Sequence, residues 1–294
     1  MKNLKGNLIL MLTAFIWGTA FVAQSTGVEH IGPLTFNGVR SFLGVAALLP
    51  VIFFMSRKKK DTGKKSDLII GGILCGLVFT AASTLQQIGL VETEPGKSGF
   101  ITALYIIIVP LIQALTGKKF GKNTLIAVII ALVGMYLLCI KNGFSISKGD
   151  LLTFLCAIFF SFHILIIDKY SPKTDGVKLS AIQFLVAGIV CCGLAVPFEV
   201  QDTSKLLDAS GSLLYTGVLS SGVAYTLQII GQKYTSPLLA TIIMSLESVF
   251  AALAGWLILG DVMSTREMTG AVLMFAAIII AQLPENLFRH KKAN

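Results

Sequence analysis

The stretch TLQQIGLVETEP, from Thr84 to Pro95, returns later in the chain as TLQIIGQKYTSP, from Thr226 to Pro237. Both stretches open on Thr-Leu-Gln, carry a glycine at the sixth position and end on proline, at a displacement of 142 positions. A segment that repeats so far along a hydrophobic chain indicates that one unit has been duplicated and fused. Such a construction is typical of membrane transporters whose pathway lies between the two copies.

The repetition extends outward at nearly the same displacement. Arg40-Ser41-Phe42-Leu43 corresponds to Gln183-Phe184-Leu185-Val186, and Leu12-Thr13-Ala14 corresponds to Leu155-Cys156-Ala157. We therefore expect two domains of similar fold, residues 1–142 and residues 143–294.

The composition indicates an integral membrane protein. Of the 294 residues, 54% are hydrophobic and 13% are charged, whereas soluble domains carry about 25% charged residues. The net charge of +9 does not predict nucleic-acid binding, because the basic residues lie in short loops without an aromatic-interleaved patch. The five cysteines lie inside apolar runs without CxxC spacing, so we expect neither a disulfide framework nor a metal site.

Ten apolar runs approach the ~20 residues that a bilayer-spanning helix requires. Five runs fall in each copy, and because five is odd, the second copy enters the membrane from the opposite side. The prediction is an all-α protein of ten transmembrane helices, arranged as two inverted five-helix repeats. The expected runs are Leu4–Ser25, Leu34–Ser56, Asp67–Val91, Ser98–Thr116, Thr124–Ile140, Asp150–Asp168, Leu179–Pro197, Gly211–Gln232, Pro237–Leu259 and Glu267–Leu283.

Lysines and arginines in the loops predict the orientation. With the N-terminus inside, the inner loops and termini hold 18 of these residues and the outer loops hold 5. The positive-inside rule then places both termini in the cytoplasm of a multi-pass protein of the cytoplasmic membrane. A cleaved signal peptide is not expected, because the first apolar run is long and aligns with an internal helix.

Glu247 is the sharpest candidate for a functional residue. An ionisable group at membrane depth costs about 2.5–3.5 kcal/mol on insertion scales. Glu247 lies ten residues after Pro237, about 15 Å along a helix, and so near the midplane. It is either a cavity-facing carboxylate that binds a substrate amine or carries a coupling proton, or a structural residue hydrogen-bonded to neighbouring helices.

Two further ionisable groups lie inside the predicted helices. Arg40 is close to the outer end of its helix, and we expect it to snorkel to the interface. A pairing of Arg40 with Glu247 stays open from the sequence. His163 could relay protons or contact substrate, but a hydrogen-bonded packing histidine is the favoured interpretation.

Three aromatic residues also lie within helices rather than in the interfacial belts: Trp17, Tyr105 and Tyr225. Each can pack between helices or line a wet cavity with its polar group. Trp17 precedes Gly18, which leaves room either for a flat ligand or for a close helix crossing. We expect all three aromatics to form cavity walls together with His163 and Glu247.

The sequence contains no P-loop, no zinc-ligand cluster and no Ser-His-Asp arrangement. We therefore expect neither an enzyme nor a bound cofactor or metal, and a secondary transporter becomes the default.

Two motifs resemble the EamA family of the drug/metabolite transporter superfamily. The first is Trp17-Gly18-Thr19-Ala20-Phe21, and the second extends from Tyr234 through Ser245-Leu246-Glu247 to Trp256-Leu257-Ile258-Leu259-Gly260-Asp261. The resemblance implies ten helices in inverted repeats and a cavity lined by helices 1, 3, 4, 6, 8 and 9. It also implies transport of small metabolites, amino acids or drugs, with export favoured.

The chain departs from that family's pattern at several positions. Ser248 stands where a proline usually follows the glutamate, and Asp261 stands where glutamate is commoner. Pro110 is expected to interrupt the fourth helix, because a membrane-helix proline frees a backbone carbonyl. We therefore expect helix 4 to carry this protein's own gating, and we assign gating or coupling roles to Pro110 and to the two ionisable residues Arg40 and Glu247.

The leading hypothesis is a secondary transporter, more specifically an exporter, of a small organic metabolite such as an amino acid. It would work by alternating access in a lipid bilayer, with protons as a candidate coupling ion. The first alternative is proton-coupled multidrug efflux of lipophilic cations. A membrane enzyme or a non-transporting assembly factor is the second. Substrate identity and oligomeric state stay open.

Overall fold

The structure is a computed structural model that describes residues 2–56, 63–93, 95–118, 120–140, 146–200, 203–254, 256–257 and 264–283. These residues form helices joined by short turns, and no strand occurs among them. Ten helical spans of 18 to 26 residues within the described ranges are long and apolar enough to cross a bilayer. This confirms the expected fold class.

The first repeat contains five spans, of which the fourth is divided into two helices. They are α1 (Lys2–Val28), α2 (Pro33–Ser56), α3 (Lys65–Gly89), α4 (Pro95–Thr102) with α5 (Tyr105–Leu115), and α6 (Lys122–Cys139).

The second repeat follows the same plan, with its third and fourth spans divided. They are α7 (Lys148–Tyr170), α8 (Gly176–Phe198), α10 (Ser210–Leu214) with the π-helix η2 (Tyr215–Tyr225) and α11 (Thr226–Gln232), α12 (Pro237–Met244) with α13 (Glu247–Ala254), and α14 (Thr265–Gln282). The short helices η1 (Ser171–Lys173) and α9 (Thr203–Asp208) lie in connections.

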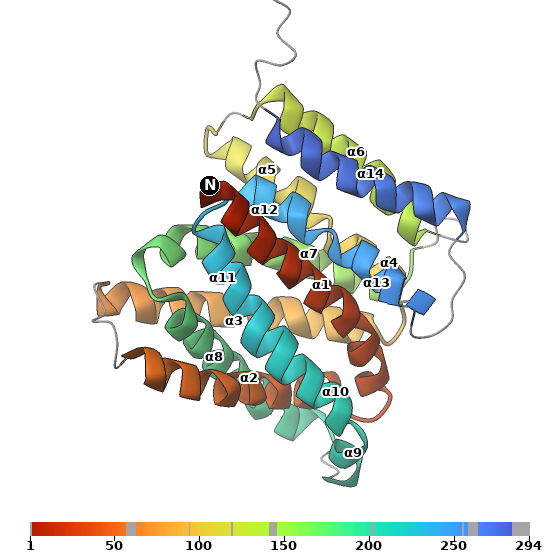
Figure 1. Ribbon diagram of the computed structural model, residues 1–294. Coiled ribbons are helices and arrows are strands. Elements are labelled where there is room, and N and C mark those ends of the chain that lie inside the picture. The colour runs from red at the N-terminus through yellow and green to blue at the C-terminus, as the bar shows by residue number, and fades with distance from the viewer. Residues whose placement is uncertain are drawn as a thin grey trace, which may run out of the picture.

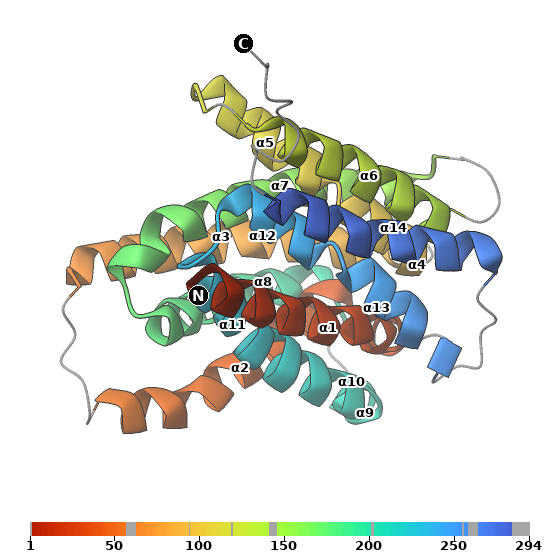
Figure 2. The same cartoon turned by 45° about the horizontal axis from the view of Figure 1, so that its top comes forward.

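The two repeats are joined by helix pairs that each take one member from either copy. Figure 1 shows α6 beside α14 at one side of the molecule and α2 beside α8 at the other. Between these pairs, α3 packs on α7 and α1 packs on α11 and α13; Figure 2 shows α1 in this central layer. The two outer pairs combine equivalent spans of the two copies, whereas each inner pair combines the first span of one copy with the third or fourth span of the other. The seam between the repeats therefore runs through the centre of the bundle.

Many large apolar side chains are exposed on the outside of the bundle, and polar side chains of the spanning helices are buried within it, as a lipid-embedded protein requires. Phe54, Ile129 and Val272 are more than 60% exposed, whereas the side chains of Gln87 and Gln183 are fully buried. In a bilayer no water is available to satisfy polar groups, so such groups collect where other helices supply partners.

Both copies break their fourth span at the same repeat position. The α-helix is interrupted at Ala103–Leu104 and at Ser245–Leu246. At both breaks a backbone hydrogen bond joins residues that are three positions apart, instead of the four of an α-helix. Leu104 N donates to Ile101 O and Leu246 N donates to Ile243 O, each at 3.2 Å. Such bonds are those of a tightened 3₁₀-type turn.

The expected interruption at Pro110 is therefore wrong in position. Pro110 lies inside α5, six residues after the break. The span expected without interruption from Pro237 to Leu259 is also divided, and its last two residues lie outside the described part of the chain.

Gly18 makes the crossing of α1 and α13 close, which resolves the two interpretations of the Trp17-Gly18 pair in favour of packing. A Cβ atom at Gly18 would lie 2.6 Å from the Glu247 carbonyl oxygen and 2.8 Å from the Ala251 nitrogen. Both atoms belong to the backbone and cannot rotate away.

We predict that Gly18→Ala lowers the free energy of unfolding by about 1–3 kcal/mol, because overpacking forces the two helices apart. Gly193→Ala is the matched control, since a Cβ there would meet nothing within 4 Å. Thermal unfolding of both purified variants measures the effect. A Gly18→Ala variant as stable as the control would contradict the close crossing.

Candidate functional site

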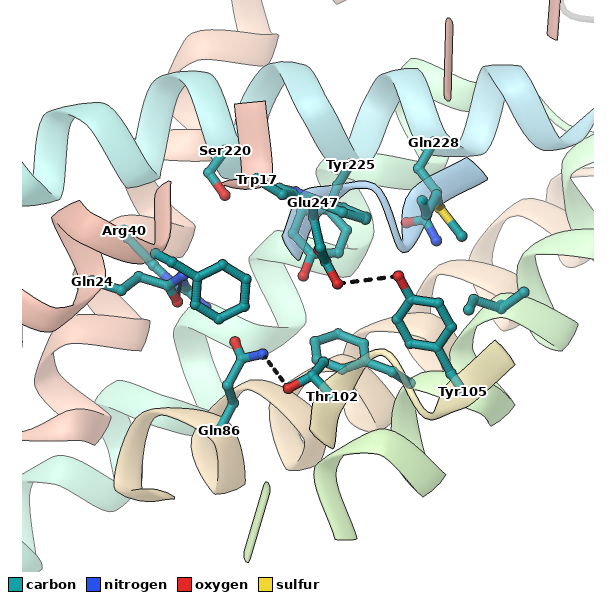
Figure 3. A pocket seen from close by; sticks show the side chains of 14 residues that line it. Trp17, Gln24, Arg40, Gln86, Thr102, Tyr105, Ser220, Tyr225, Gln228 and Glu247 are labelled. Atoms are coloured by element: carbon teal, nitrogen blue, oxygen red, sulfur yellow. Dashed lines mark hydrogen bonds between the residues drawn. The ribbon is translucent and has the colours of Figure 1, made fainter. Parts of the chain in front are cut away.

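One pocket lies on the seam between the repeats, and its cavity volume is about 30 Å³. By that measure a single water molecule needs about 10–15 Å³, so the pocket in this conformation is contracted. Figure 3 shows the polar side chains that converge on it. The lining residues are Trp17, Phe21, Gln24, Arg40, Gln86, Thr102, Tyr105, Phe160, Ile164, Ser220, Tyr225, Gln228, Met244 and Glu247.

The pocket lining follows the internal repeat. Ten of the lining residues form five pairs of repeat equivalents, so the pseudo-two-fold axis between the copies passes through the pocket. The pairs are Trp17 with Phe160, Phe21 with Ile164, Gln86 with Gln228, Thr102 with Met244, and Tyr105 with Glu247.

The Tyr105 hydroxyl donates a hydrogen bond of 3.1 Å to Glu247 Oε1, across 142 positions of sequence. Each residue is the first of a helix, α5 or α13, directly after the break in its span. The breaks therefore bring equivalent positions of the two copies together at the axis. Both residues are candidates from the sequence, but the relation between them was missed. Their separation of 142 positions, equal to the displacement of the repeat, could have identified them as equivalents.

Arg40 is only 2% exposed and lines the pocket, so the expectation that it snorkels to the interface is wrong. Its Nη1 donates to Gln24 Oε1 at 2.8 Å, and its guanidinium lies 5.7 Å from the ring centroid of Phe36. It makes no ion pair with Glu247 among the described residues. The pocket thus contains a cation and an acid that do not neutralise each other.

Three polar atoms that line the pocket have no hydrogen-bond partner among the described residues. They are Trp17 Nε1, Arg40 Nε and Gln228 Oε1. Gln86 bonds to Thr102 at 3.1 Å, but its equivalent Gln228 stands opposite Met244, which offers no such group. Buried polar groups normally find partners, so these atoms are available to a ligand.

His163 does not line the pocket, contrary to expectation. It is fully buried behind the wall, where Nε2 lies 2.8 Å from Gln183 Oε1 and the ring packs near Tyr225. This agrees with the packing role favoured from the sequence. Trp17, Tyr105, Tyr225 and Glu247 do line the pocket, whereas Pro110 does not.

Sequence reasoning missed the contribution of the second helix through Arg40, and also missed Gln24 and Phe21 as lining residues. Phe21 stands one turn after Trp17, which is a signal that helical spacing could have supplied.

The sequence model of the EamA-like transporter family matches residues 4–140 and again residues 147–282. The chain belongs to the EamA-like transporter family. It is 33% identical to an uncharacterized transporter of Archaeoglobus fulgidus, covering 96% of this chain and 87% of that protein. A crystal structure with 18% identity has a TM-score of 0.78 over 97% of this chain and 99% of its own, which supports the fold alone.

Two other relatives carry more specific names. The uncharacterized inner membrane transporter YedA of Escherichia coli is 26% identical, over 94% of this chain and 90% of its own. The S-adenosylmethionine/S-adenosylhomocysteine transporter of Chlamydia muridarum is 24% identical, over 86% of this chain and 84% of its own. The family motif's Asp261 lies outside the residues that the structure describes.

We predict that Tyr105→Phe destabilises the transporter by about 1–3 kcal/mol, because Glu247 then loses its donor in a buried site. Tyr225→Phe is the control, since it removes a buried hydroxyl from the same pocket without breaking any hydrogen bond found in the described part of the chain. Thermal unfolding in detergent compares the two. Equal losses would show that the bond to Glu247 adds nothing.

Proposed function

We propose that this EamA-family protein is a secondary transporter that exports a small organic metabolite with both a carboxylate and an amino group, such as an amino acid. The observation that carries the proposal is the coexistence, in one pocket on the pseudo-two-fold axis, of Arg40 and Glu247, neither of which forms an ion pair with a described residue.

The charges and unpaired atoms favour a substrate with two unlike ends. Arg40 Nε is a free charged donor at one side of the pocket in Figure 3, where a carboxylate would satisfy it. Glu247 and the side-chain amide oxygen of Gln228 (Oε1) lie toward the other side, where they can accept hydrogen bonds from an ammonium group. Trp17, Phe21 and Phe160 offer an apolar wall for the remainder.

The names of the relatives are compatible with such a substrate. The chlamydial relative is named as a transporter of S-adenosylmethionine and S-adenosylhomocysteine, and both molecules end in an amino-acid group. The multidrug alternative is less favoured, because a buried arginine repels a lipophilic cation.

Alternating access would follow from the inverted repeats, each of which can take the conformation of the other. The loop charges favour an orientation with both termini in the cytoplasm. With that orientation, the direction proposed here is loading of the pocket from the cytoplasm and release outside.

We predict that the purified protein in sealed proteoliposomes transports amino acids. It should not transport the analogous amines, which lack the carboxylate, or the analogous carboxylic acids, which lack the amino group. Radiolabelled uptake over empty liposomes measures this for a broad panel, which includes S-adenosylmethionine and cationic dyes. Transport of the amine alone, or of the dyes, would support cation efflux instead. Folded protein that moves no compound of the panel would refute the proposal.

Arg40→Gln should raise the KM for the amino acid about 10-fold or more, since a hydrogen bond to a charged group is worth about 1.5–3 kcal/mol. Glutamine is the residue at the equivalent position of the second repeat, Gln183, so the fold accommodates it. Arg266→Gln is the control, because Arg266 stacks on Tyr136, and neither residue lines the pocket. An unchanged KM would remove Arg40 from the substrate site.

Glu247→Gln tests the role of this residue in coupling. Glutamine keeps an acceptor for the Tyr105 hydroxyl but cannot bind or release a proton at neutral pH. We predict that flux continues and no longer responds to an imposed pH gradient. Glu29→Gln, which alters an exposed carboxylate away from this pocket, should keep the response. A pH response that survives in Glu247→Gln would exclude Glu247 as the coupling group.

A further inference from the structure

Each end of the bundle is closed by a contact between the repeats, and the two contacts are repeat equivalents of each other. At one end, Thr93 Oγ1 donates to Asp150 Oδ1 at 3.1 Å. At the other end, Thr235 Oγ1 donates to Asn7 Oδ1 at 3.2 Å. Thr235 follows Thr93 by the displacement of the repeat, and Asp150 follows Asn7 by the displacement that relates Gln183 to Arg40.

Close glycine crossings accompany both contacts. A Cβ at Gly149 would lie 2.8 Å from the carbonyl oxygen of Gly89, and a Cβ at Gly6 would lie 3.0 Å from that of Gly231. These crossings join α3 to α7 at one end and α11 to α1 at the other. Figures 1 and 2 show the start of α1 and the region of α4 at opposite ends of the bundle. Both ends are therefore closed here, in agreement with the contracted pocket.

The chemistry of the two contacts differs. Asp150 also accepts from Lys97 Nζ at 2.6 Å, and this ion pair is largely buried, with side-chain exposures of 6% and 19%. Asn7 instead donates to Gln282 Oε1 at 2.9 Å, and Leu239 stands at the position equivalent to Lys97. We call Thr93, Lys97 and Asp150 the acidic latch, and Asn7, Thr235 and Gln282 the amide latch. Charge-assisted hydrogen bonds are roughly twice as strong as neutral ones.

The caps of the equivalent helices α2 and α8 also differ between the two ends of the bundle. At the end of the acidic latch, Glu199 at the end of α8 accepts from Leu34 N at 2.7 Å and from Thr35 N at 2.8 Å, so one repeat caps a helix of the other. At the opposite end, the equivalent helix start is capped by Asp175 of its own repeat. The end of the amide latch has uncharged or exposed contacts between the repeats instead: Asn123 Nδ2 donates to Leu283 O at 3.1 Å, and Lys5 Nζ lies 5.6 Å from the centroid of the Tyr234 ring.

We infer that the acidic latch makes its end of the bundle the more firmly closed, so that the pocket opens preferentially at the end of the amide latch. The residues that set this preference are Asp150 and Lys97 on one side and their uncharged equivalents, Asn7 and Leu239, on the other. With the orientation proposed above, the preferred opening faces the cytoplasm, which is the loading side of an exporter. That last step rests on the proposed function; the preference itself does not.

Hydrogen–deuterium exchange of the full chain in lipid nanodiscs, without substrate, tests the preference directly. Asp150→Asn with Lys97→Leu gives the acidic latch the chemistry of the amide latch. Exchange at peptides covering residues 89–93 and 149–155 should then rise about tenfold. Lys148→Leu is the matched control, because it removes an exposed lysine at the same end that has no partner among the described residues. Unchanged exchange in the double variant, or an equal rise in the control, would overturn the inference.

The converse variant, Asn7→Asp with Leu239→Lys, moves the ion pair to the other end. Exchange at peptides covering residues 5–12 and 231–239 should fall about tenfold, and an unchanged or faster exchange there would contradict the inference. Neither measurement needs a substrate, so a protein that fails every flux assay still gives a result. Chemical labelling of a tag at the N-terminus in intact cells shows separately which end faces the cytoplasm.

Discussion

The hydrogen bond between Tyr105 and Glu247 joins the same position of two inverted copies, and the central part of the structure is arranged around it. Near a pseudo-two-fold axis, equivalent residues meet each other. Two glutamates there would bring like charges together, and two tyrosines would leave the site without an acid. One copy supplies the donor and the other the acceptor, so the divergence of the repeats turns a symmetric contact into a polar bond.

The breaks that bring these two residues together lie where a membrane protein can tolerate them. Irregular backbone at membrane depth is stable only when it is buried in protein or lines a cavity. The breaks at Ala103–Leu104 and Ser245–Leu246 adjoin the pocket, and the π-helix η2 contributes Ser220 and Tyr225 to its wall. Irregular geometry, unpaired polar atoms and the symmetry axis thus coincide in one place, while the lipid-facing helices α6 and α14 are continuous.

Hydropathy and the repeat were sufficient to predict the fold, because the bilayer dictates both helix length and the placement of apolar residues. The expected run Leu34–Ser56, for example, differs from α2 by a single residue. The break in the fourth span was missed because neither Ala103 nor Leu104 is a helix breaker; packing of the two copies determines it. Arg40 was misjudged because depth along one helix does not reveal that neighbouring helices enclose it. The contact of Tyr105 with Glu247, by contrast, could have been predicted, because the two residues are separated by the displacement of the repeat.

Two identical inverted copies would give inward-open and outward-open conformations of equal free energy, since each copy could adopt the shape of the other. Any preference between them must therefore arise where the copies differ. At the pocket and the two latches the charged differences are Arg40 against Gln183, Asp150 against Asn7, Lys97 against Leu239, and Glu247 against Tyr105. Arg40 and Glu247 line the pocket, while Asp150 and Lys97 form the latch at one end. The duplicated scaffold thus supplies the two conformations, and the residues that have diverged divide between those that recognise a substrate and those that choose the side from which it enters.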